Sequence, residues 1–534
     1  MTLDELCRND GLLFEADGIV RVPFLVKGRL VSPPAITRRD AEAAFAGADP
    51  DSMYATVRGA QLLRQPVIDR ADMRYTGEYL YQIMPAVDPF ELIETDFDRL
   101  ASGPYALTVD EILAFLKAMA AAFGESWATL DRARTIYRRT SSLPDLYGDA
   151  AFAALAGGLD PTTAAEMIDN ELGVWGLPGR RFLDGWVELP ANIIPGLAPL
   201  LAQGLTGGPR LAAPVAAAIR AMPTRQLHIT AGNAPQVPIV SALRLILTKS
   251  AGVIKSPAEA TLPAALLALA AASAAPDHPL TRNVSLVYWK GGDEAVERVL
   301  FAPGAFDRIV VWGAPDAVSA VQARAAFTRV IAFNPRYGLS LIGQEAFAGR
   351  LAEVVALAAQ DVMINDQKAC TSSLIQYVEG TTAQAEVYAA ALAEALGRWD
   401  RLSPPFIPPA TQGQLKRLRR GRYSRARWLA HGGEGDPAST VIVTPEEFDI
   451  LAHPMSRLVV IRPIAQLGDA LRYLHAGVSM VGVYPETRRL ALRDAIAARG
   501  VSSVLPLGQC ERLFAGGPQD GMMVLSELVD WKNG

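Results

Sequence analysis

Short apolar runs alternate with helical patterns in a regular rhythm between residues 226 and 333. The apolar runs predict strands at 226–231, 252–255, 284–289, 308–312 and 328–333. The segments between them predict helices at 235–249, 259–274, 293–301 and 315–326. Alternation of this kind indicates a parallel sheet with helices on both faces. We therefore expect an α/β fold with a doubly wound, Rossmann-like domain over residues 226–337.

A second α/β pattern occupies residues 338–505. It has helix patterns at 344–360 and 383–398, and strand patterns at 374–379, 440–443, 457–462 and 478–483. The chain has 534 residues, half of them apolar, which is enough to bury more than one core. We expect residues 1–225 to form a mixed helical region packed on the first domain, and residues 506–534 to form a separate C-terminal segment.

The charge and cysteine content exclude several classes of protein. A formal net charge of -5 gives no overall attraction to nucleic acid. The three cysteines, Cys7, Cys370 and Cys510, are too far apart in sequence for a metal cage or a disulfide framework. A cytoplasmic protein is the expectation that follows. The longest apolar run, residues 262–276, falls short of the roughly 20 residues that span a bilayer, so we predict a buried helix there.

One stretch is strongly basic. "KRLRRGRYSRARW", residues 416–428, contains no acidic residue. A solvated helix or loop is the simpler interpretation of such a run. The alternative is a docking surface for an acidic carrier domain or for the phosphates of a coenzyme.

Turns of small and polar residues follow three predicted strands of the first domain. They read "GNAPQ" at 232–236, "KSPAE" at 255–259 and "GAPD" at 313–316. Doubly wound sheets bind ligands at the carboxyl ends of their strands, and a glycine such as Gly313 lets a phosphate approach the backbone. The sequence lacks a GxGxxG fingerprint, so these turns by themselves support a dinucleotide only weakly.

The stretch "NDQKACTSS", residues 365–373, presents a lone cysteine, Cys370, in polar surroundings. A nucleophilic cysteine needs access to substrate, a route to the thiolate and donors for an oxyanion. A lone cysteine is more often a small buried residue. The five histidines lie in unrelated contexts and indicate no Cys-His pair; His453 is the one most suited to face a cleft.

Several motifs together resemble the acyl-CoA reductase family. They are residues 228–260, "RIVVWGAPDAV" at 308–318, "FNPRYGLSLIG" at 333–343, "NDQKACTSS", and the tail at 516–534. This family is typified by the reductase component of the fatty acid reductase complex of bacterial luminescence. It is a divergent branch of the aldehyde dehydrogenase superfamily. The resemblance extends from about residue 150 onward and implies an aldehyde dehydrogenase-like fold with a cofactor domain and a catalytic domain.

The resemblance implies catalytic roles for two residues. Cys370 matches the nucleophile, and it follows Gln367 of a glutamine-containing motif. Asn233 in "AGNAP" matches the asparagine whose amide holds the oxyanion together with the cysteine's backbone N–H.

The resemblance also implies a nicotinamide site without a metal. Lys255 matches the lysine that contacts the adenosine ribose, with Ser256 and Glu259 nearby, and Gly313 matches the turn before the helix that faces the phosphates. The family implies NADPH; NADH stays an alternative, and Lys255 is compatible with a 2'-phosphate.

One departure from the superfamily affects the expected reaction. Hydrolytic members carry a glutamate that activates water, but the matching stretch here, "AFNPRYGLS" at 332–340, has no acid. A second glutamate is missing where "HPMSRLVV" stands at 453–460. Loss of the base disfavours hydrolysis of an acyl-cysteine and leaves it for hydride. The resemblance therefore implies NADPH-dependent reduction of a long-chain fatty acyl thioester, donated by coenzyme A or an acyl carrier, to the aldehyde.

Two other interpretations stay open at this point. One is oxidation of an aldehyde to an acid or thioester, and the other is a non-catalytic scaffold that binds an acyl carrier. The resemblance also implies a homo-oligomer, paired in part through residues 522–534, and an acyl transferase or synthetase as a candidate partner that hands over the substrate.

Overall fold

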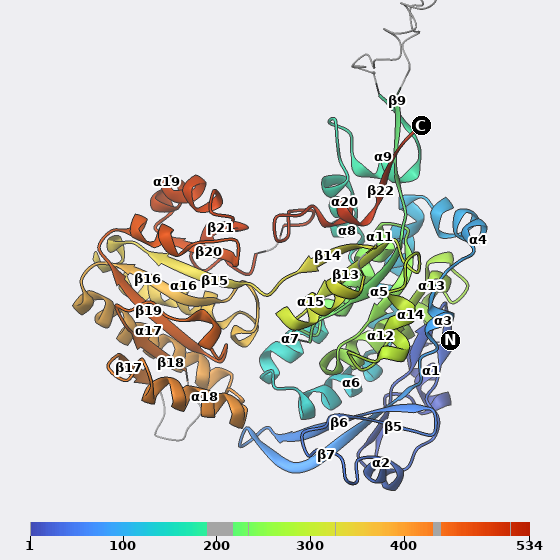
Figure 1. Cartoon of the computed structure of the whole chain (residues 1–534), viewed down its shortest axis with the longest axis horizontal. Helices are drawn as coiled ribbons and strands as arrows, with labels where there is room; N and C mark the ends of the chain where they lie inside the picture. Colours follow the sequence, from blue (N-terminus) through green and yellow to red (C-terminus); the bar gives the residue numbers. More distant parts are fainter. Residues whose placement is uncertain (1, 190–216, 233, 326, 431–438, 513) are drawn as a thin grey trace, which may run out of the picture.

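The computed structural model describes residues 2–189, 217–232, 234–325, 327–430, 439–512 and 514–534. Its two largest sheets have seven strands each and form the centres of two lobes, which lie side by side in Figure 1. The chain passes from the first lobe to the second where β14 (Arg329–Phe333) leads into β15 (Tyr337–Ile342). It returns in the segment that follows β21 (Ser503–Pro506).

The sheet of the first lobe has the strand order β14-β13-β10-β11-β12-β3-β4. Its parallel strands are β10 (Arg225–Ile229), β11 (Ala251–Lys255), β12 (Val284–Val287), β13 (Arg308–Trp312) and β14. Because β11 and β13 both pair with β10, the strand order reverses at β10, and doubly wound sheets bind their ligands at the carboxyl ends of strands beside such a reversal. The five strands predicted in this domain are confirmed.

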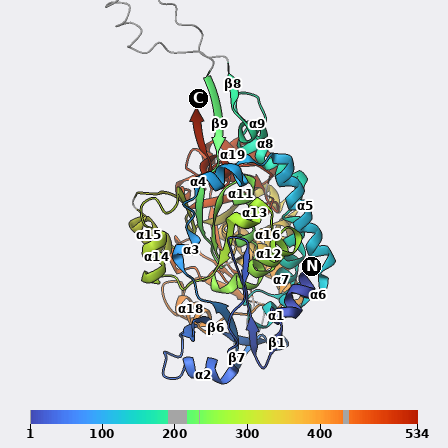
Figure 2. The ribbon, with the colours of Figure 1, turned by 90° about the vertical axis from the view of Figure 1, so that its right-hand side faces the viewer.

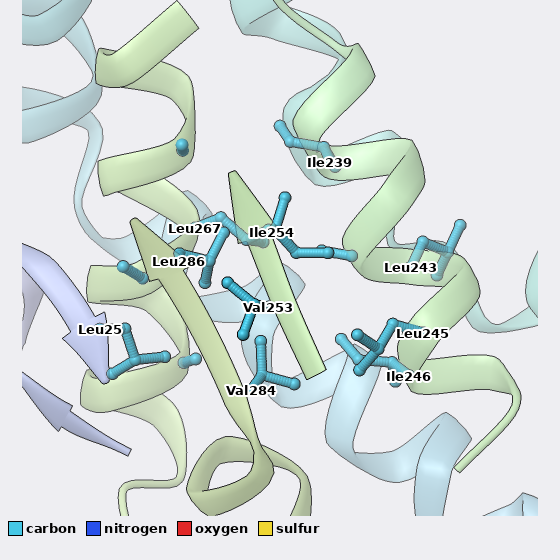
Figure 3. Packing of buried hydrophobic residues seen from close by; sticks show 14 of the residues in the cluster. Leu25, Ile239, Leu243, Leu245, Ile246, Val253, Ile254, Leu267, Val284 and Leu286 are labelled. Carbon is cyan, nitrogen blue, oxygen red and sulfur yellow. The ribbon is translucent and has the colours of Figure 1, made fainter. Parts of the chain in front are cut away.

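Helices α11 (Val237–Leu247), α12 (Thr261–Ala274), α13 (Pro279–Asn283), α14 (Glu294–Leu300) and α15 (Pro315–Arg324) connect these strands. Figure 3 shows Leu245 and Ile246 of α11 and Leu267 of α12 on the sides of their helices that face the sheet residues Val253 and Leu286. Full burial of such a side chain stabilises the fold by about 1.5–3 kcal/mol. In α12, residues 261–271 are all buried, so the apolar run is a core helix, as predicted.

The N-terminal region contributes strands as well as helices. Strands β3 (Phe24–Val26) and β4 (Arg29–Val31) extend the first sheet, with β3 antiparallel to β12. A separate sheet contains β1 (Glu15–Ala16), β2 (Ile19–Arg21), β5 (Tyr54–Val57), β6 (Ala60–Asp69) and β7 (Arg74–Pro85). The sequence analysis predicted helices here but neither of these sheet contributions.

Most N-terminal helices pack on the first lobe. They are α1 (Leu3–Asp10), α3 (Pro89–Leu92), α4 (Phe97–Ser102), α5 (Val109–Glu125), α6 (Trp127–Thr140), α7 (Asp145–Gly157), α8 (Pro161–Glu171) and α9 (Gly179–Asp184). Helix α2 (Arg38–Ala44) packs instead on the separate N-terminal sheet, where Ala41 lies in a cluster with residues of β6 and β7. Helix α5 begins at a capping box, in which Thr108 and Glu111 exchange side-chain and backbone hydrogen bonds. The β6–β7 hairpin reaches the second lobe, where Tyr75 packs edge-on against Phe406 with 5.0 Å between ring centroids.

The sheet of the second lobe has the order β17-β18-β19-β16-β15-β20-β21. Its remaining strands are β16 (Ser373–Glu379), β17 (Arg427–Ala430), β18 (Thr440–Val443), β19 (Leu458–Ile464) and β20 (Val478–Tyr484). All neighbours are parallel except β17, which pairs antiparallel with β18 at the edge. Helices α16 (Leu351–Met363), α17 (Thr382–Leu402), α18 (Pro409–Arg420) and α19 (Glu486–Ala497) surround it. The strands and helices predicted here are confirmed, and β15, β17 and β21 are additional.

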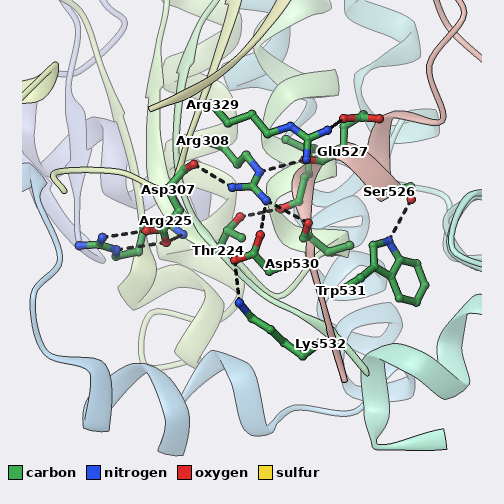
Figure 4. Close-up of polar contacts among 12 residues, drawn as sticks. Thr224, Arg225, Asp307, Arg308, Arg329, Ser526, Glu527, Asp530, Trp531 and Lys532 are labelled. Atoms are coloured by element: carbon green, nitrogen blue, oxygen red, sulfur yellow. Dashed lines mark hydrogen bonds and ion pairs between the residues drawn. The ribbon is translucent and has the colours of Figure 1, made fainter. Parts of the chain in front are cut away.

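A three-stranded sheet projects from the first lobe, as Figure 2 shows. It consists of β8 (Val187–Leu189), β9 (Ala217–Met222) and β22 (Asp530–Asn533), and α20 (Val524–Leu528) precedes β22. Figure 4 shows how this C-terminal segment is fastened: Arg308 in β13 forms an ion pair with Asp530 and donates to the carbonyl of Glu527 at 3.1 Å. Thr224 donates to the carbonyl of Leu528 at 2.6 Å. Within the described ranges, no helix is long and apolar enough to cross a membrane.

Candidate active site

Cys370 lies between α16 and β16, at the amino end of the second sheet, and it is exposed. Its neighbour Lys368 contacts the first lobe, where the ammonium group donates to the hydroxyl of Ser142 at 3.0 Å. The same ammonium group donates to the Ser142 carbonyl at 3.2 Å. The cysteine therefore lies on the side of the second lobe that meets the first.

The backbone before the cysteine takes an unusual conformation. Asn365, Asp366 and Gln367 have φ angles of 47°, 56° and 62°, which place all three in the left-handed region. Each non-glycine residue in this region costs about 1–2 kcal/mol, so other contacts must hold the loop. This left-handed turn directs the following residues back toward the sheet edge.

Gln367 supplies one of these contacts. Its side-chain amide donates to the carbonyl of Leu458 at 2.6 Å, and its side-chain oxygen accepts from the Leu458 N–H at 3.0 Å. The amide thus pairs with the first residue of β19 as a neighbouring strand would. Both residues are fully buried.

Arg457 supplies the second contact. Its guanidinium is fully buried and lies 2.6 Å from carboxylate oxygens of both Asp366 and Asp400. It also donates to the carbonyl of Ser403 at 2.8 Å. The two carboxylates raise the pKa of Arg457 against the opposing effect of burial, so the guanidinium stays charged and joins the loop to α17.

The charges around the thiol oppose one another. Burial raises the pKa of Cys370, and the negative charge of Asp520 raises it further. A hydrogen bond from Ser479 in β20, the cysteine's own backbone N–H and the positive charge of Arg336 lower it. Cys370 is exposed as a residue, yet the groups packed beside its thiol exclude enough water to favour the neutral form. At neutral pH the resting cysteine is therefore protonated.

Asp520 reaches this position on a tight turn of the C-terminal segment. Gln519 and Met522 exchange two backbone hydrogen bonds of 2.9 Å, and both central residues, Asp520 and Gly521, have positive φ angles of 51° and 82°. This is the geometry of a type I′ turn, which favours Asp-Gly. The Asp520 side chain is 10% exposed, and the Arg336 Nε lies 3.6 Å from its Oδ1.

A buried arginine supports the same turn from the first lobe. Arg244 in α11 is 6% exposed and donates to the side-chain oxygen of Gln519. Its guanidinium lies 5.6 Å from the ring centroids of both Trp312 and Phe333. These two rings stack with centroids 3.8 Å apart at the ends of β13 and β14. Burial lowers the pKa of Arg244 to about 10, which keeps it charged at neutral pH.

Phe333 belongs to the stretch 332–340, which matches the segment where hydrolytic members of the superfamily carry a glutamate. The structure shows an aromatic pair there in place of a carboxylate. Apolar rings cannot activate water as a base. The acid whose charge acts on the Cys370 thiol is Asp520, which belongs to the C-terminal segment.

Lys255 lies at the carboxyl end of β11 in an aromatic surround. Its ammonium lies 5.6 Å from the ring centroid of Tyr288 and 5.7 Å from that of Trp289. Burial lowers its pKa to about 8, opposed by the acidic Glu297 and Glu259. Among the described residues it makes cation–π contacts but no hydrogen bond, which suits an incoming anionic or hydroxyl-bearing ligand.

The other predicted cofactor residues are distributed around this point. Glu259 follows β11, and its carboxylate lies against Gly232. A β-carbon added to Gly232 would stand only 2.2 Å from a carboxylate oxygen of Glu259. The Ser256 hydroxyl donates to the carbonyl of Val287 at 3.3 Å, so it is already engaged in a hydrogen bond to β12. Gly313 precedes α15, and a β-carbon there would approach only Ala317 at 3.4 Å. Asn233 lies outside the described residues.

The histidines make no pair with Cys370 in the described structure. His453 was expected to face a cleft, but it is buried, lies 3.0 Å from the carbonyl of Leu458, and burial lowers its pKa to about 4. His228 is buried beside Gln226. His475 bonds Tyr337 at 3.1 Å. No group of three or more potential metal ligands occurs among the described residues.

The sequence analysis missed Arg336, Ser479 and Asp520. The dipeptide Asp520-Gly521 is a recognisable turn signal. It gives no indication that the turn lies beside a cysteine 150 residues earlier in the chain.

Comparison with known proteins places these features in context. The profile of the acyl-CoA reductase (LuxC) family matches residues 218–531. A long-chain acyl-protein thioester reductase from Vibrio harveyi is 27% identical over 318 residues, which are 58% of this chain and 64% of that protein. The chain thus spans just under two thirds of that relative. A long-chain acyl-protein thioester reductase from Photorhabdus laumondii is 28% identical over 68% of this chain and 69% of its own.

Solved structures show the same fold. Lactaldehyde dehydrogenase from Escherichia coli superposes with a TM-score of 0.67 at 15% identity, covering 96% of this chain and 98% of that one. The expected aldehyde dehydrogenase-like α/β fold is therefore confirmed.

Proposed function

Because the chain belongs to the acyl-CoA reductase (LuxC) family, we propose that it reduces a long-chain fatty acyl thioester to the aldehyde, with NADPH, through an acyl-cysteine on Cys370. The observation that carries the proposal is an exposed cysteine held on a braced loop, with an aromatic pair where hydrolytic relatives hold an acid. The relatives are named for acyl-protein thioesters, which agrees with a thioester donor.

The loop geometry suits acyl transfer. The left-handed turn and the Gln367 and Arg457 contacts fix the backbone of Cys370, whose N–H already bonds the sulfur. Attack on the thioester carbonyl forms the acyl-cysteine and releases the donor thiol. Asn233 and the Cys370 N–H are the proposed donors to the oxyanion.

The residues of the first lobe fit a nicotinamide dinucleotide. When bound, this cofactor supplies the hydride that reduces the acyl carbon. Lys255 presents a buried cation between aromatic rings, at the carboxyl end of β11, where it can hold a ribose hydroxyl or a 2'-phosphate. Glu259 lies beside it for a ribose hydroxyl, and Gly313 leaves the backbone after β13 open to the phosphates.

The Trp312–Phe333 stack disfavours hydrolysis of the acyl-cysteine. The rings offer no base to water and exclude it from the surface that they cover. The acyl group therefore persists until hydride arrives. Collapse of the resulting thiohemiacetal returns the Cys370 thiolate and releases the aldehyde.

The donor's carrier is proposed to dock on α18. This helix has no buried residue, and its exposed basic side chains have no ion-pair partner within the described part of the chain; they are Lys416, Arg417, Arg419 and Arg420. An acidic acyl carrier protein complements such a surface. Replacing all four by glutamate is expected to raise KM at least tenfold for an acyl carrier thioester. KM for a short acyl-pantetheine thioester should not change.

Two outcomes would contradict the docking proposal. One is an unchanged KM for the carrier. The other is an equal loss when glutamates replace Arg493 on α19 and Arg499 just after that helix, two residues that are exposed and distant in sequence from α18.

The central experiment follows NADPH oxidation and acyl adducts together. With a long-chain acyl-CoA, the wild-type protein should form an acyl adduct on Cys370, detected by mass spectrometry, and release aldehyde once NADPH is added. Cys370→Ser should abolish both. Adduct formation that ends in free acid without NADPH would instead identify a hydrolase, and the absence of any adduct would identify a binding scaffold.

A further inference from the structure

Lys368 links the cysteine loop, residues 364–372, to the first lobe. Its ammonium group donates to the hydroxyl of Ser142 at 3.0 Å and to the Ser142 carbonyl at 3.2 Å. Ser142 lies between α6 and α7, and Figure 1 shows α7 on the side of the first lobe that faces the second. The Lys368 side chain is 24% exposed, so most of it is enclosed. The cysteine loop thus touches the lobe that is proposed to hold the cofactor.

The segment that accepts these hydrogen bonds is itself held in place. Arg70, which follows β6, donates to the carbonyls of Ser141 at 2.7 Å and Leu143 at 3.3 Å. Its Nε lies 3.5 Å from Oδ1 of Asp145, the first residue of α7. The guanidinium of Arg70 therefore contacts the chain on both sides of Ser142. The acceptor on the first lobe has a fixed backbone.

The cysteine loop transmits this contact to Cys370. The loop is closed by the hydroxyl of Ser372, which donates to the carbonyl of Ile364 at 2.9 Å. Within it, the Ser372 N–H donates to the carbonyl of Ala369 at 3.0 Å, which places Cys370 in a tight turn. Lys368 precedes this turn directly. A displacement of Lys368 should therefore move the thiol as well.

The shape of the loop is held within its own lobe by other contacts. Gln367 and Arg457 join it to β19 and α17. Burial lowers the pKa of Lys368, because enclosing an ammonium group carries a desolvation cost. That cost offsets much of what the two hydrogen bonds contribute to stability. The contact with Ser142 therefore contributes more to the alignment of the two lobes than to the stability of the fold.

We propose that Lys368 is a positioning residue of the reaction, which fixes Cys370 relative to the first lobe through Ser142. The inference rests on the proposed thioester reductase activity. The thiol belongs to the second lobe, whereas the residues proposed to bind the cofactor belong to the first. Hydride transfer to the acyl-cysteine therefore takes place across the junction of the lobes. A misplacement of about 1 Å at such a junction can slow a reaction about 10²-fold.

Lys368→Met tests the proposal because it removes the ammonium group and keeps a long side chain. Cys370 is first acylated with acyl-CoA, and NADPH is then added in a single turnover. Hydride transfer should be about 10²-fold slower than in the wild-type protein. Alkylation of Cys370 by iodoacetamide needs only the thiol, whose pKa is lowered by the charge of Arg336, so it should keep its wild-type rate. A residue that merely supported the fold would not separate these two rates.

Ser142→Ala tests the other end of the contact. It removes the hydroxyl acceptor and leaves the carbonyl, so it should slow hydride transfer by less than Lys368→Met does. Added to Lys368→Met, it should have no further effect, because both substitutions act through one contact. Lys368→Arg can still reach Ser142 and should recover part of the rate. Lys117→Met changes an exposed lysine of α5 and should leave both rates unchanged.

Three results with these variants would overturn the inference. The first is an unchanged rate of hydride transfer in Lys368→Met, and the second is an equal loss in alkylation. The third is a further loss when Ser142→Ala is added to Lys368→Met. Failure of the proposed function is distinguishable, because the acylated wild-type protein would then leave NADPH unoxidised; that result would remove the inference together with the function.

Discussion

Gln367 offers a test in which glycine should be better tolerated than alanine. Its side chain bonds both backbone groups of Leu458, at 2.6 and 3.0 Å, while its own backbone is left-handed at φ 62°. Either substitution leaves the buried Leu458 N–H without its hydrogen-bond acceptor. The Leu458 carbonyl keeps a partner in His453 at 3.0 Å, so the lost contacts should cost about 2–4 kcal/mol in total.

The two variants should differ in their free energy of unfolding because of the backbone conformation at residue 367. Alanine keeps the left-handed strain of about 1–2 kcal/mol, and glycine releases it. Glycine also lowers the free energy of unfolding by about 0.5–1 kcal/mol relative to alanine, because it gives the unfolded chain greater freedom. Gln367→Gly should therefore be more stable than Gln367→Ala by about 1 kcal/mol, the reverse of the order found in regular structure.

Urea denaturation of both variants measures this difference as a free energy of unfolding. Lys368 is the matched control, because its φ of -94° is ordinary and both of its variants lose the same contact to Ser142. There, alanine should be the more stable. Equal stability of the two Gln367 variants, or losses below about 0.5 kcal/mol for both, would refute the proposed clamp.

Three further outcomes are expected. Arg457→Met should lower the free energy of unfolding by about 3–5 kcal/mol, measured by denaturation, because it removes the guanidinium that pairs with the buried Asp366 and the partly buried Asp400. NADPH affinity should weaken as pH rises through about 8, where Lys255 loses its charge; titration of Lys255→Arg should show a flat profile, and a flat wild-type profile would contradict the assignment. Gly232→Ala should displace the Glu259 carboxylate and raise KM for the cofactor while the melting temperature stays within a few degrees, and an unchanged KM would contradict a role for Glu259 in cofactor binding.

The sequence predicted the parallel sheets well because strands buried on both faces form continuous apolar runs, as in Arg308–Trp312. β15 was not predicted because its run, "YGLSLI", was treated as part of a motif and not as a strand. The β6–β7 sheet was not predicted because its long strands carry polar residues at irregular intervals.

Cys370 could be singled out from the sequence because "NDQKACTSS" matches a motif of the family, and its role as the nucleophile stays a prediction. Its surroundings could not be predicted, because Arg336, Ser479 and Asp520 are brought together only when the β14–β15 connection, β20 and a distant turn meet. Local patterns carry no information about such encounters. Gln367 illustrates the same limit: its motif suggested a neighbour of the cysteine, whereas the structure shows an amide that substitutes for a strand.

The contacts between β13 and the C-terminal segment also affect the order of biosynthesis. Arg308 lies 219 residues before Glu527, whose carbonyl it binds, and 222 residues before its ion-pair partner Asp530. At a translation rate of about 5–20 residues per second, the ribosome takes roughly 10–45 s to supply these partners. During that interval the first lobe exposes an unmatched cation, and the turn that carries Asp520 does not yet exist. The nascent chain should therefore expose Cys370 before the turn that carries Asp520 exists, and the surroundings of the cysteine should become complete only after the first lobe has waited on the ribosome.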